Sequence, residues 1–264
     1  MTVLYPEKFF VKVEKKIARS SPDHLMPWGT RRDNHRHYRF NEKLYQLFGF
    51  PNKKFDLFVL DLGCAGGGFV KSCIDDGCFS LGIEGSDYSR KMQRAEWNII
   101  PNFLFTGDIT GNFDILDQNK KRLKFDVITC WEVMEHLKET EIAAVIKNVR
   151  KHLKSSGLWF ISITSIQDIV HGYRLHQTVK PKEWWIKKFS SFGFQNLTEH
   201  LSYFRGNFVR PAKKGIINQF YLILSYSPKD APTIPREVLI DRLLDRWYVS
   251  RPYRVLRKLI VNEK

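Results

Sequence analysis

Apolar and amphipathic stretches alternate along most of this chain. Five apolar runs have the length and composition of buried strands, and each ends at a turn or a helical stretch. They lie at 55–62, 79–83, 103–108, 125–131 and 158–164. Apolar residues at helical spacing follow them, at 69–74, 89–97, 142–153 and 183–192. Strands that alternate with helices predict an α/β fold built on a parallel sheet.

Two further runs, 195–203 and 219–226, are expected to form an antiparallel pair that closes the sheet. The predicted fold is therefore Rossmann-like and doubly wound, with seven mostly parallel strands and an antiparallel last strand. Ligands of such sheets bind at the carboxyl ends of the strands. Hydrophobic residues make up 43% of the 264 residues, which is enough for a substantial core.

We predict three parts in the chain. Residues 1–50 form an N-terminal lid or substrate-binding segment, in which the first clear element is a short helix at 41–48. Within it, 24–40 concentrates three His and four Arg around Trp28, as binding loops often do. Residues 51–227 form the ligand-binding domain. After a proline-rich break, 228–264 forms a basic amphipathic helical extension.

The first strand runs into a glycine turn, Gly-Cys-Ala-Gly-Gly-Gly, which lets a ligand approach the backbone closely. The turn only approximates a dinucleotide fingerprint, since Ala65 occupies a position where a pyrophosphate requires glycine. Asp61 precedes the turn, and its carboxylate suits a cationic ligand better than a pyrophosphate. Glu84 ends the next strand, where an acid can bind a ribose, and Asp108 ends the third. We expect these three acids to share one edge of the sheet.

The segment Asp-Leu-Gly-Cys-Ala-Gly-Gly at 61–67 resembles the first motif of class I S-adenosylmethionine-dependent methyltransferases, with Ala65 as the one departure. The resemblance covers about 55–225. It implies S-adenosyl-L-methionine as cofactor, with Asp108 at the adenine amino group and Ile109 beside the ring. The predicted donor-binding residues are Asp61, Gly63, Ala65, Gly67, Glu84, Gly85, Asp108, Ile109 and Trp131.

The segment Glu132-Val-Met-Glu-His follows the fourth strand and is similar to a Glu-x-x-Glu-His segment of ubiquinone-type O-methyltransferases and small-RNA 2'-O-methyltransferases. That resemblance implies a possible metal site for Mg²⁺ or Mn²⁺ at Glu132, Glu135 and His136, which would share one helical face. The alternative is that His136 acts as a plain general base or has a structural role. The predicted catalytic residues are His136, His176 and Glu132.

Basic residues are concentrated at the two ends of the chain. The formal net charge is +15, yet 51–200 holds 20 Lys and Arg against 18 Asp and Glu. The ends suit an anionic partner: an anionic acceptor, a nucleic acid, or a membrane surface contacted by the C-terminal basic helix. Simple solvation of these charges is the alternative. We expect no signal peptide, no transmembrane segment and no disulfide framework, and therefore a cytoplasmic protein.

These observations predict a methyltransferase of class EC 2.1.1 that methylates a sugar hydroxyl on a glycan or nucleotide sugar. RNA 2'-O-methylation is the alternative within enzymes, although the Lys-Asp-Lys-Glu set of many such enzymes is not found. A binding module or pseudoenzyme is the alternative outside them, and a nicotinamide dehydrogenase is a further one.

Overall fold

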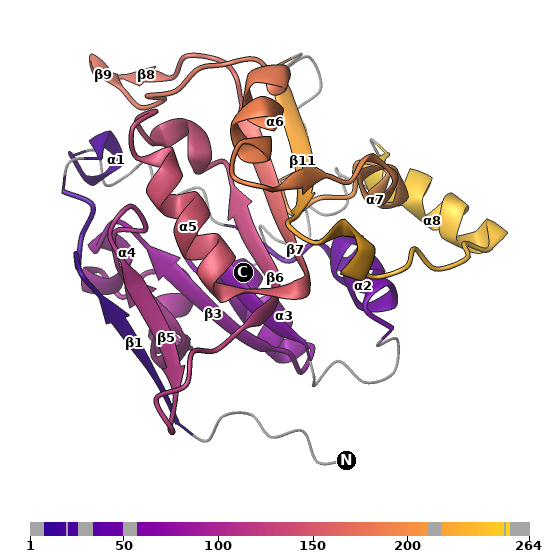
Figure 1. Cartoon of the computed structure of the whole chain (residues 1–264), viewed down its shortest axis with the longest axis horizontal. Coiled ribbons are helices and arrows are strands. Elements are labelled where there is room, and N and C mark those ends of the chain that lie inside the picture. Colours follow the sequence, from indigo (N-terminus) through magenta and orange to yellow (C-terminus); the bar gives the residue numbers. More distant parts are fainter. Residues whose placement is uncertain are drawn as a thin grey trace.

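The central sheet contains seven strands in the predicted kind of topology. The structure, a computed structural model, describes residues 8–19, 21–25, 34–49, 57–210, 218–250 and 252–253. In the order β10-β11-β7-β6-β2-β3-β4, the strands are Gln195–Asn196, Gln219–Ser225, Leu153–Thr164, Phe125–Trp131, Phe58–Leu62, Phe79–Glu84 and Leu104–Thr106. β11 pairs antiparallel with both of its neighbours, and the other pairs are parallel. The predicted fold class is confirmed (Figure 1).

Helices cover both faces of this sheet, each against its own apolar cluster. On one face, α5 (Ile142–His152) and α6 (Lys182–Ser190) pack against side chains of β6 and β7. On the other face, α2 (Tyr38–Leu47), α3 (Gly68–Asp75) and α7 (Thr198–Phe204) share a second cluster. Burial on both faces explains why the central strands are nearly continuous apolar runs.

Two predicted elements were wrong in part. The run 195–203 pairs with β11 only at Gln195 and Asn196 and then becomes α7. Leu197, Leu201 and Phe204 all join the second cluster, and their spacing is helical. The helix expected at 89–97 divides into α4 (Tyr88–Lys91) and a 3-10 turn, η2 (Ala95–Asn98). Gln93, between them, and Ala95, the first residue of η2, have positive φ, which interrupts a helix.

A second sheet was missed. β1 (Phe9–Val13) pairs antiparallel with β5 (Phe113–Asp117), although about a hundred residues separate them in sequence. Phe9, Val11 and Val13 alternate toward the first apolar cluster, so the first fifty residues did contain a strand pattern. Beyond β1 lies one helical turn, α1 (Pro22–Leu25). Trp28 and its neighbours at 26–33 lie outside the described residues.

Short elements complete the described chain. They are the 3-10 turns η3 (Pro101–Phe103), η4 (Met134–His136) and η5 (Pro228–Asp230), the hairpin β8 (Ile169–Val170) with β9 (Tyr173–Arg174), and the C-terminal helix α8 (Leu239–Val249). α8 lies beside α2, at the end of the molecule far from β1 and β5 (Figure 1). The three-part division of the chain stays a prediction.

The four cysteines are buried thiols. None of the helices in the described ranges combines the length and the hydrophobicity needed to span a bilayer.

Candidate active site

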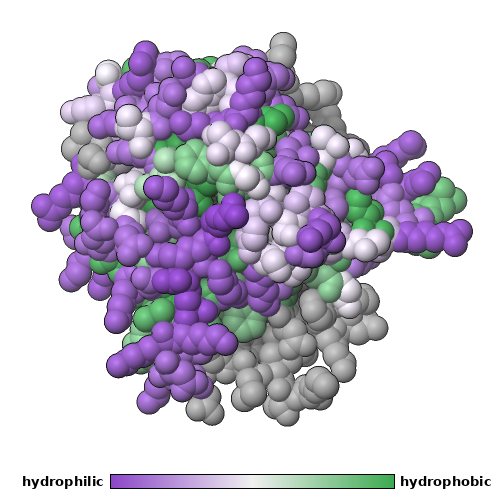
Figure 2. Space-filling view, in the orientation of Figure 1, coloured by the Kyte–Doolittle hydropathy of each residue, from purple (hydrophilic) through white to green (hydrophobic). Residues whose placement is uncertain are grey.

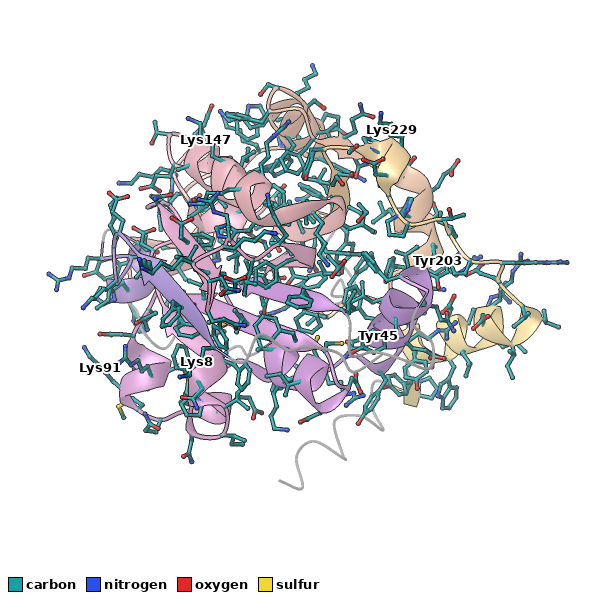
Figure 3. The ribbon with its side chains drawn as sticks, turned by 60° about the horizontal axis from the view of Figure 1, so that its bottom comes forward. Lys8, Tyr45, Lys91, Lys147, Tyr203 and Lys229 are labelled. Atoms are coloured by element: carbon teal, nitrogen blue, oxygen red, sulfur yellow. The ribbon has the colours of Figure 1, made fainter. Side chains whose placement is uncertain are left out.

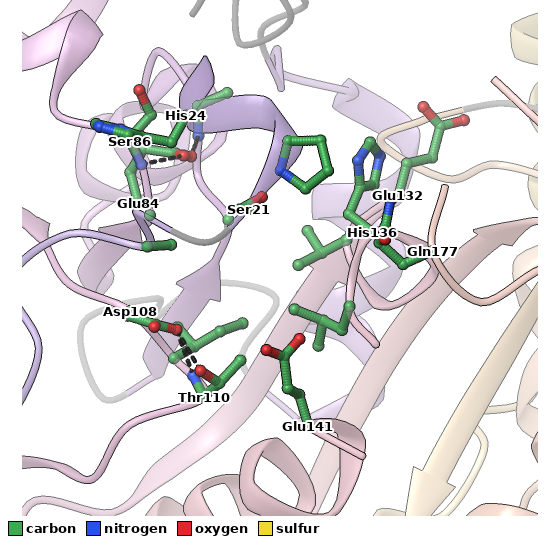
Figure 4. A pocket seen from close by; sticks show the side chains of 18 of the residues that line it. Ser21, His24, Glu84, Ser86, Asp108, Thr110, Glu132, His136, Glu141 and Gln177 are labelled. Carbon is green, nitrogen blue, oxygen red and sulfur yellow. Dashed lines mark hydrogen bonds between the residues drawn. The ribbon is translucent and has the colours of Figure 1, made fainter. Parts of the chain in front are cut away.

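A pocket opens where β2, β3, β4 and β6 end, which is the edge of the sheet that the sequence indicated. The predicted residues that line it are Gly63, Ala65, Glu84, Gly85, Asp108, Ile109, Trp131, Glu132 and His136. Glu84 and Asp108 lie on one side, and His136, Glu132 and Gln177 on the other (Figure 4). We refer to these two sides as the donor side and the acceptor side.

The glycine turn and Glu84 are tied together on the donor side. Ala65 has φ 49°, and its N–H donates to Glu84 Oε2 over 2.7 Å. The N–H of Ser86 donates to Glu84 Oε1 over 3.1 Å. Two backbone N–H groups therefore hold this carboxylate at the pocket wall, with its orientation set before any ligand arrives.

Asp108 lies at the lower left in Figure 4, and Ile109, the next residue, also lines the pocket. Asp108 Oδ1 accepts hydrogen bonds from both the N–H and the hydroxyl of Thr110, at 2.9 and 2.6 Å (Figure 4). The backbone carbonyl of Ile109 is held by Asn148 at 3.0 Å. Both residues are therefore held in the pocket wall by hydrogen bonds within the protein.

Asp61 does not line the pocket, contrary to the expectation that it faces the ligand. It precedes the end of β2 and lies opposite Thr129 of β6, whose hydroxyl donates to Asp61 Oδ1 over 2.6 Å. The Asn34 amide lies 3.4 Å from Asp61 Oδ2 and also 3.4 Å from the carbonyl of Gly63. Complete burial raises the pKa of Asp61 to about 7. Asp61 thus supports the glycine turn from the buried side, through Asn34.

Gly67 also lies outside the lining, at the start of α3. It has φ 85°, and a Cβ there would lie 2.6 Å from Leu104. Gly63 is the glycine of this turn that lines the pocket. A Cβ on Gly63 would lie only 2.3 Å from Val133 Cγ2, so the turn and the segment after β6 are in close contact.

His136 lies on the acceptor side, at the end of the turn η4. The His176 ring packs edge-on against it, with ring centroids 4.8 Å apart, and its Nδ1 contacts the carbonyl of Ile166. His176 is buried and outside the pocket lining. Of the two predicted bases, His136 is therefore the one that a pocket ligand can reach.

Glu132 and Glu135 diverge, because the chain forms a 3-10 turn here where a helix was expected. Glu132 has φ 55° and contacts Arg210 and Gln219, at 3.2 and 2.9 Å. Glu135 points inward and accepts from the Thr164 N–H over 2.8 Å, and burial raises its pKa to about 7. The described part of the chain contains no group of three His, Cys, Asp or Glu side chains that could hold a metal ion. The predicted metal site is thus not supported.

Several pocket residues had not been predicted. One wall is the N-terminal segment, whose Ala18 N–H donates to Gly85 and whose Lys15 carbonyl accepts from Asp108, at 2.9 and 2.8 Å. Its lining residues are Ala18, Ser21, Pro22 and His24. Arg210 lines the acceptor side and donates to Asn34 over 2.8 Å. His24 belongs to the stretch 24–40 that was predicted as a binding loop, whereas no local pattern marks Ala18, Ser21, Pro22 or Arg210, because only the tertiary fold brings them to the sheet.

The fold and the pocket define a class of protein that binds an adenosine-bearing ligand at the end of a mostly parallel sheet. The chain belongs to the methyltransferase domain family, whose sequence model matches residues 27–210. The predicted class of S-adenosylmethionine-dependent methyltransferases is confirmed, and the dehydrogenase alternative is set aside.

Curated relatives are similar to part of this chain. A ubiquinone biosynthesis O-methyltransferase of Glaesserella parasuis is 35% identical over 127 residues, which is 46% of this chain and 48% of the relative. The enzyme of the same name from Pasteurella multocida is 31% identical over 125 residues, 44% of this chain and 48% of the relative. The chain thus spans about half the length of these relatives.

Solved structures resemble the chain at low identity. An S-adenosylmethionine-dependent methyltransferase from Clostridium acetobutylicum has a TM-score of 0.48 and 13% identity, covering 76% of this chain and 96% of that one. A magnesium protoporphyrin IX methyltransferase from Synechocystis has the same TM-score and identity, covering 76% of this chain and 94% of that one.

Proposed function

We propose that this protein transfers the methyl group of S-adenosylmethionine to a hydroxyl oxygen of a small acceptor, with His136 as general base. The observation that carries the proposal is the composition of the pocket. The glycine turn, Glu84 and Asp108 lie on one side of a continuous pocket, and His136 lies on the other. Methyl transfer needs such an arrangement, because donor and acceptor must meet in line within one enclosed space.

On the donor side, Glu84 binds the ribose hydroxyls, and Asp108 and Ile109 contact the adenine. The methionyl part of the donor then lies against Gly63 and Ala65. The Trp131 indole N–H is buried at this point without a hydrogen-bond partner in the described ranges, and it can donate to a ligand oxygen. Asp61 contributes indirectly, through Asn34 and the shape of the turn.

On the acceptor side, the hydroxyl oxygen attacks the methyl carbon as the bond from carbon to sulfur breaks. The hydroxyl proton passes to His136, and the donor leaves as neutral S-adenosylhomocysteine. Glu132, held by Arg210, shapes the wall beside this histidine. Lys138 also lines the pocket, so an acceptor with an anionic group finds a cation there.

The names of the curated relatives favour a phenolic acceptor such as a quinone precursor. They give no support to the sugar acceptor that we expected, and a glycan or nucleotide sugar is now the second choice. RNA remains an alternative that rests on the basic ends alone.

The test measures donor affinity and turnover separately. We expect S-adenosylmethionine to bind in calorimetry, and the protein to methylate at least one member of a panel of polyhydroxyphenols, nucleotide sugars and short RNAs. His136→Ala should lower kcat by about 10²–10⁴-fold, because general-base catalysis contributes that much. Its donor affinity should stay within about twofold of wild type, since the histidine is assigned to the acceptor side.

His200→Ala is the matched control, because that histidine contacts the carbonyl of Pro232 far from the pocket lining. An unchanged kcat in His136→Ala would contradict its role as base. Tight donor binding without any methylated product, in the panel or in cell extract, would favour a binding module.

A further inference from the structure

The C-terminal helix α8 is held to the protein by its acidic residues. The fully buried Arg39 on α2 contacts Asp245 and Asp241, at 2.5 and 3.0 Å. The equally buried Lys43 contacts Asp245 and Glu237, at 2.8 and 3.0 Å. Two basic side chains of α2 thus anchor α8 through an ion-pair network.

The ion-pair network also includes a residue at the end of α7. Arg205, at the end of α7, contacts Glu237 over 2.6 Å and Asp245 over 3.4 Å. Figure 3 shows Tyr203 of α7 beside α2, and its hydroxyl donates to Gln46 over 3.0 Å. The helix α8 and the segment before it therefore have a defined orientation relative to α2 and α7.

This orientation turns the apolar residues of α8 toward solvent. The exposed fractions are 74% for Leu239, 63% for Ile240, 57% for Leu243 and 48% for Trp247. Leu239, Leu243 and Trp247 follow one another at four-residue spacing, so they form one stripe along the helix. Amphipathic helices of globular proteins usually bury such a stripe and expose their charges. Here the stripe is exposed, and hydrophobic and hydrophilic side chains lie side by side where the molecule projects at the right of Figure 2.

The charges that remain on this side are positive. Arg242 and Arg246 are exposed beside the apolar stripe, and Arg236 is exposed just before the helix. The acidic residues of the same stretch, Glu237, Asp241 and Asp245, are engaged by Arg39, Lys43 and Arg205. The ion-pair network thus leaves the exposed side of α8 apolar and cationic. We call Leu239, Ile240, Leu243 and Trp247, with Arg242 and Arg246, the α8 outer face.

We propose that the α8 outer face binds the surface of a bilayer that contains anionic phospholipids. An exposed apolar stripe with arginines beside it and a tryptophan among its residues is the composition of helices that lie in the membrane interface. The acyl boundary covers the leucines and isoleucine, and the phosphates pair with the arginines. A second copy of this chain is a poorer partner, because it would bring the same positive charges to the contact.

The test uses the full chain and lipid vesicles, and it does not depend on methyl transfer. In flotation assays, we expect binding to phosphatidylcholine vesicles that contain about a third phosphatidylglycerol, and at least about tenfold weaker binding to phosphatidylcholine alone. The triple variant Leu239→Ser, Leu243→Ser, Trp247→Ser should lose at least about tenfold in affinity for the anionic vesicles. Its fold should be intact, since all three side chains are exposed.

A matched control replaces two equally exposed apolar residues elsewhere, Met92→Ser and Ile99→Ser, at 63% and 60% exposure, and should bind as wild type does. Wild-type emission should shift to shorter wavelength when anionic vesicles are added, because Trp247 enters the interface. In Trp247→Phe, binding should persist and most of this shift should disappear.

Three results would overturn the proposal. The first is a wild-type protein that does not bind anionic vesicles. The second is undiminished binding by the triple variant, which would locate the contact elsewhere in the chain. The third is a wild-type protein that sediments as a dimer and does not bind vesicles, together with a triple variant that sediments as a monomer. That result would assign the α8 outer face to a second copy.

Discussion

The two sides of the pocket are built in different ways. On the donor side, Glu84 ends β3 and Asp108 follows β4, so two neighbouring strands of the parallel sheet bring these acids together. On the acceptor side, His136, Gln177 and Arg210 come from a 3-10 turn, a loop and a segment far along the chain. The comparison teaches that the proposed donor site is built from local strand ends, whereas the proposed acceptor site is built from long-range contacts. Each prediction below tests this difference.

The largest effect is expected at Gly63, where the two sides touch. In Gly63→Ala, the new Cβ would lie 2.3 Å from Val133 Cγ2, at a backbone φ of 76°. Overpacking and left-handed strain together should lower the free energy of unfolding by about 2–5 kcal/mol, measured by urea denaturation. Donor affinity and kcat should both fall, because the clash pushes the turn away from the segment that leads to His136.

The double variant Gly63→Ala, Val133→Ala should regain the part of the free energy of unfolding that Gly63→Ala loses through the clash. Gly172→Ala is the matched control, since Gly172 also has positive φ, at 83°, but has nothing within 4 Å of its Cβ position. A Gly63→Ala variant no worse than this control would show that the two sides are not in contact there.

The next effect concerns the two buried acids, one beneath each side of the pocket. Desolvation raises the pKa of Asp61 and of Glu135 to about 7, well above the values these groups have in an unfolded chain. The folded state therefore retains these protons to higher pH than the unfolded state does. Stability should fall as pH rises from about 4 to about 8, by on the order of 2–4 kcal/mol for each acid.

Asp61→Asn and Glu135→Gln should each flatten this dependence when urea denaturation is repeated across that pH range. Asp75→Asn is the control, because Asp75 is an exposed residue that pairs with Lys71. A pH dependence as steep as that of the wild type in both variants would contradict the raised pKa values.

A smaller effect is expected for Glu84→Gln on the donor side. The carboxylate accepts from two backbone N–H groups, and hydrogen bonds to a charged group contribute about 1.5–3 kcal/mol. Donor affinity in calorimetry should fall by about 10–100-fold, while kcat at saturating donor stays near wild type. Asp87→Asn is the control. Asp87 pairs with Lys91 outside the pocket, and its replacement should change neither donor affinity nor kcat. A fall in kcat without loss of donor affinity would show that Glu84 acts on the acceptor side and not on the donor side.

The smallest effect is expected for His176→Phe. The His176 ring contacts His136 edge-on and does not line the pocket, so it can position the base but not contact the acceptor. Phenylalanine keeps the aromatic contact and loses the hydrogen bond from Nδ1 to the Ile166 carbonyl, which is worth about 0.5–1.5 kcal/mol, so kcat should fall by about 2–10-fold. A loss as large as that of His136→Ala would make His176 the base after all.

The sequence predicted the part of the molecule that depends on local patterns. Apolar runs located the sheet strands, and position at a strand end was enough to place Glu84 and Asp108 at the pocket. Asp61 satisfied the same pattern but lies one residue before the end of β2, so its side chain points beneath the turn. Side chains alternate between the two faces of a strand, so this difference of one residue directs Asp61 away from the pocket.

The rest depends on contacts between distant segments. Glu132 and Glu135 would share a face on a helix, but the positive φ of Glu132 and the turn η4 direct them to different partners. Arg210 reaches Glu132 across 78 positions of sequence, and β1 reaches β5 across about a hundred. No window of sequence short enough to show a pattern contains both members of such a pair.

The pairing of β1 with β5 also determines when the donor pocket becomes complete. The wall that contains Ala18 lies between β1 and α1, and β1 has no partner strand until Phe113–Asp117 exists. During synthesis, the first strand must therefore wait for more than a third of the chain to emerge before it can dock. Closing so long a loop is slow, so this wall should be completed late in folding. A protein that has lost only this early segment would keep its folded core and yet bind the donor poorly.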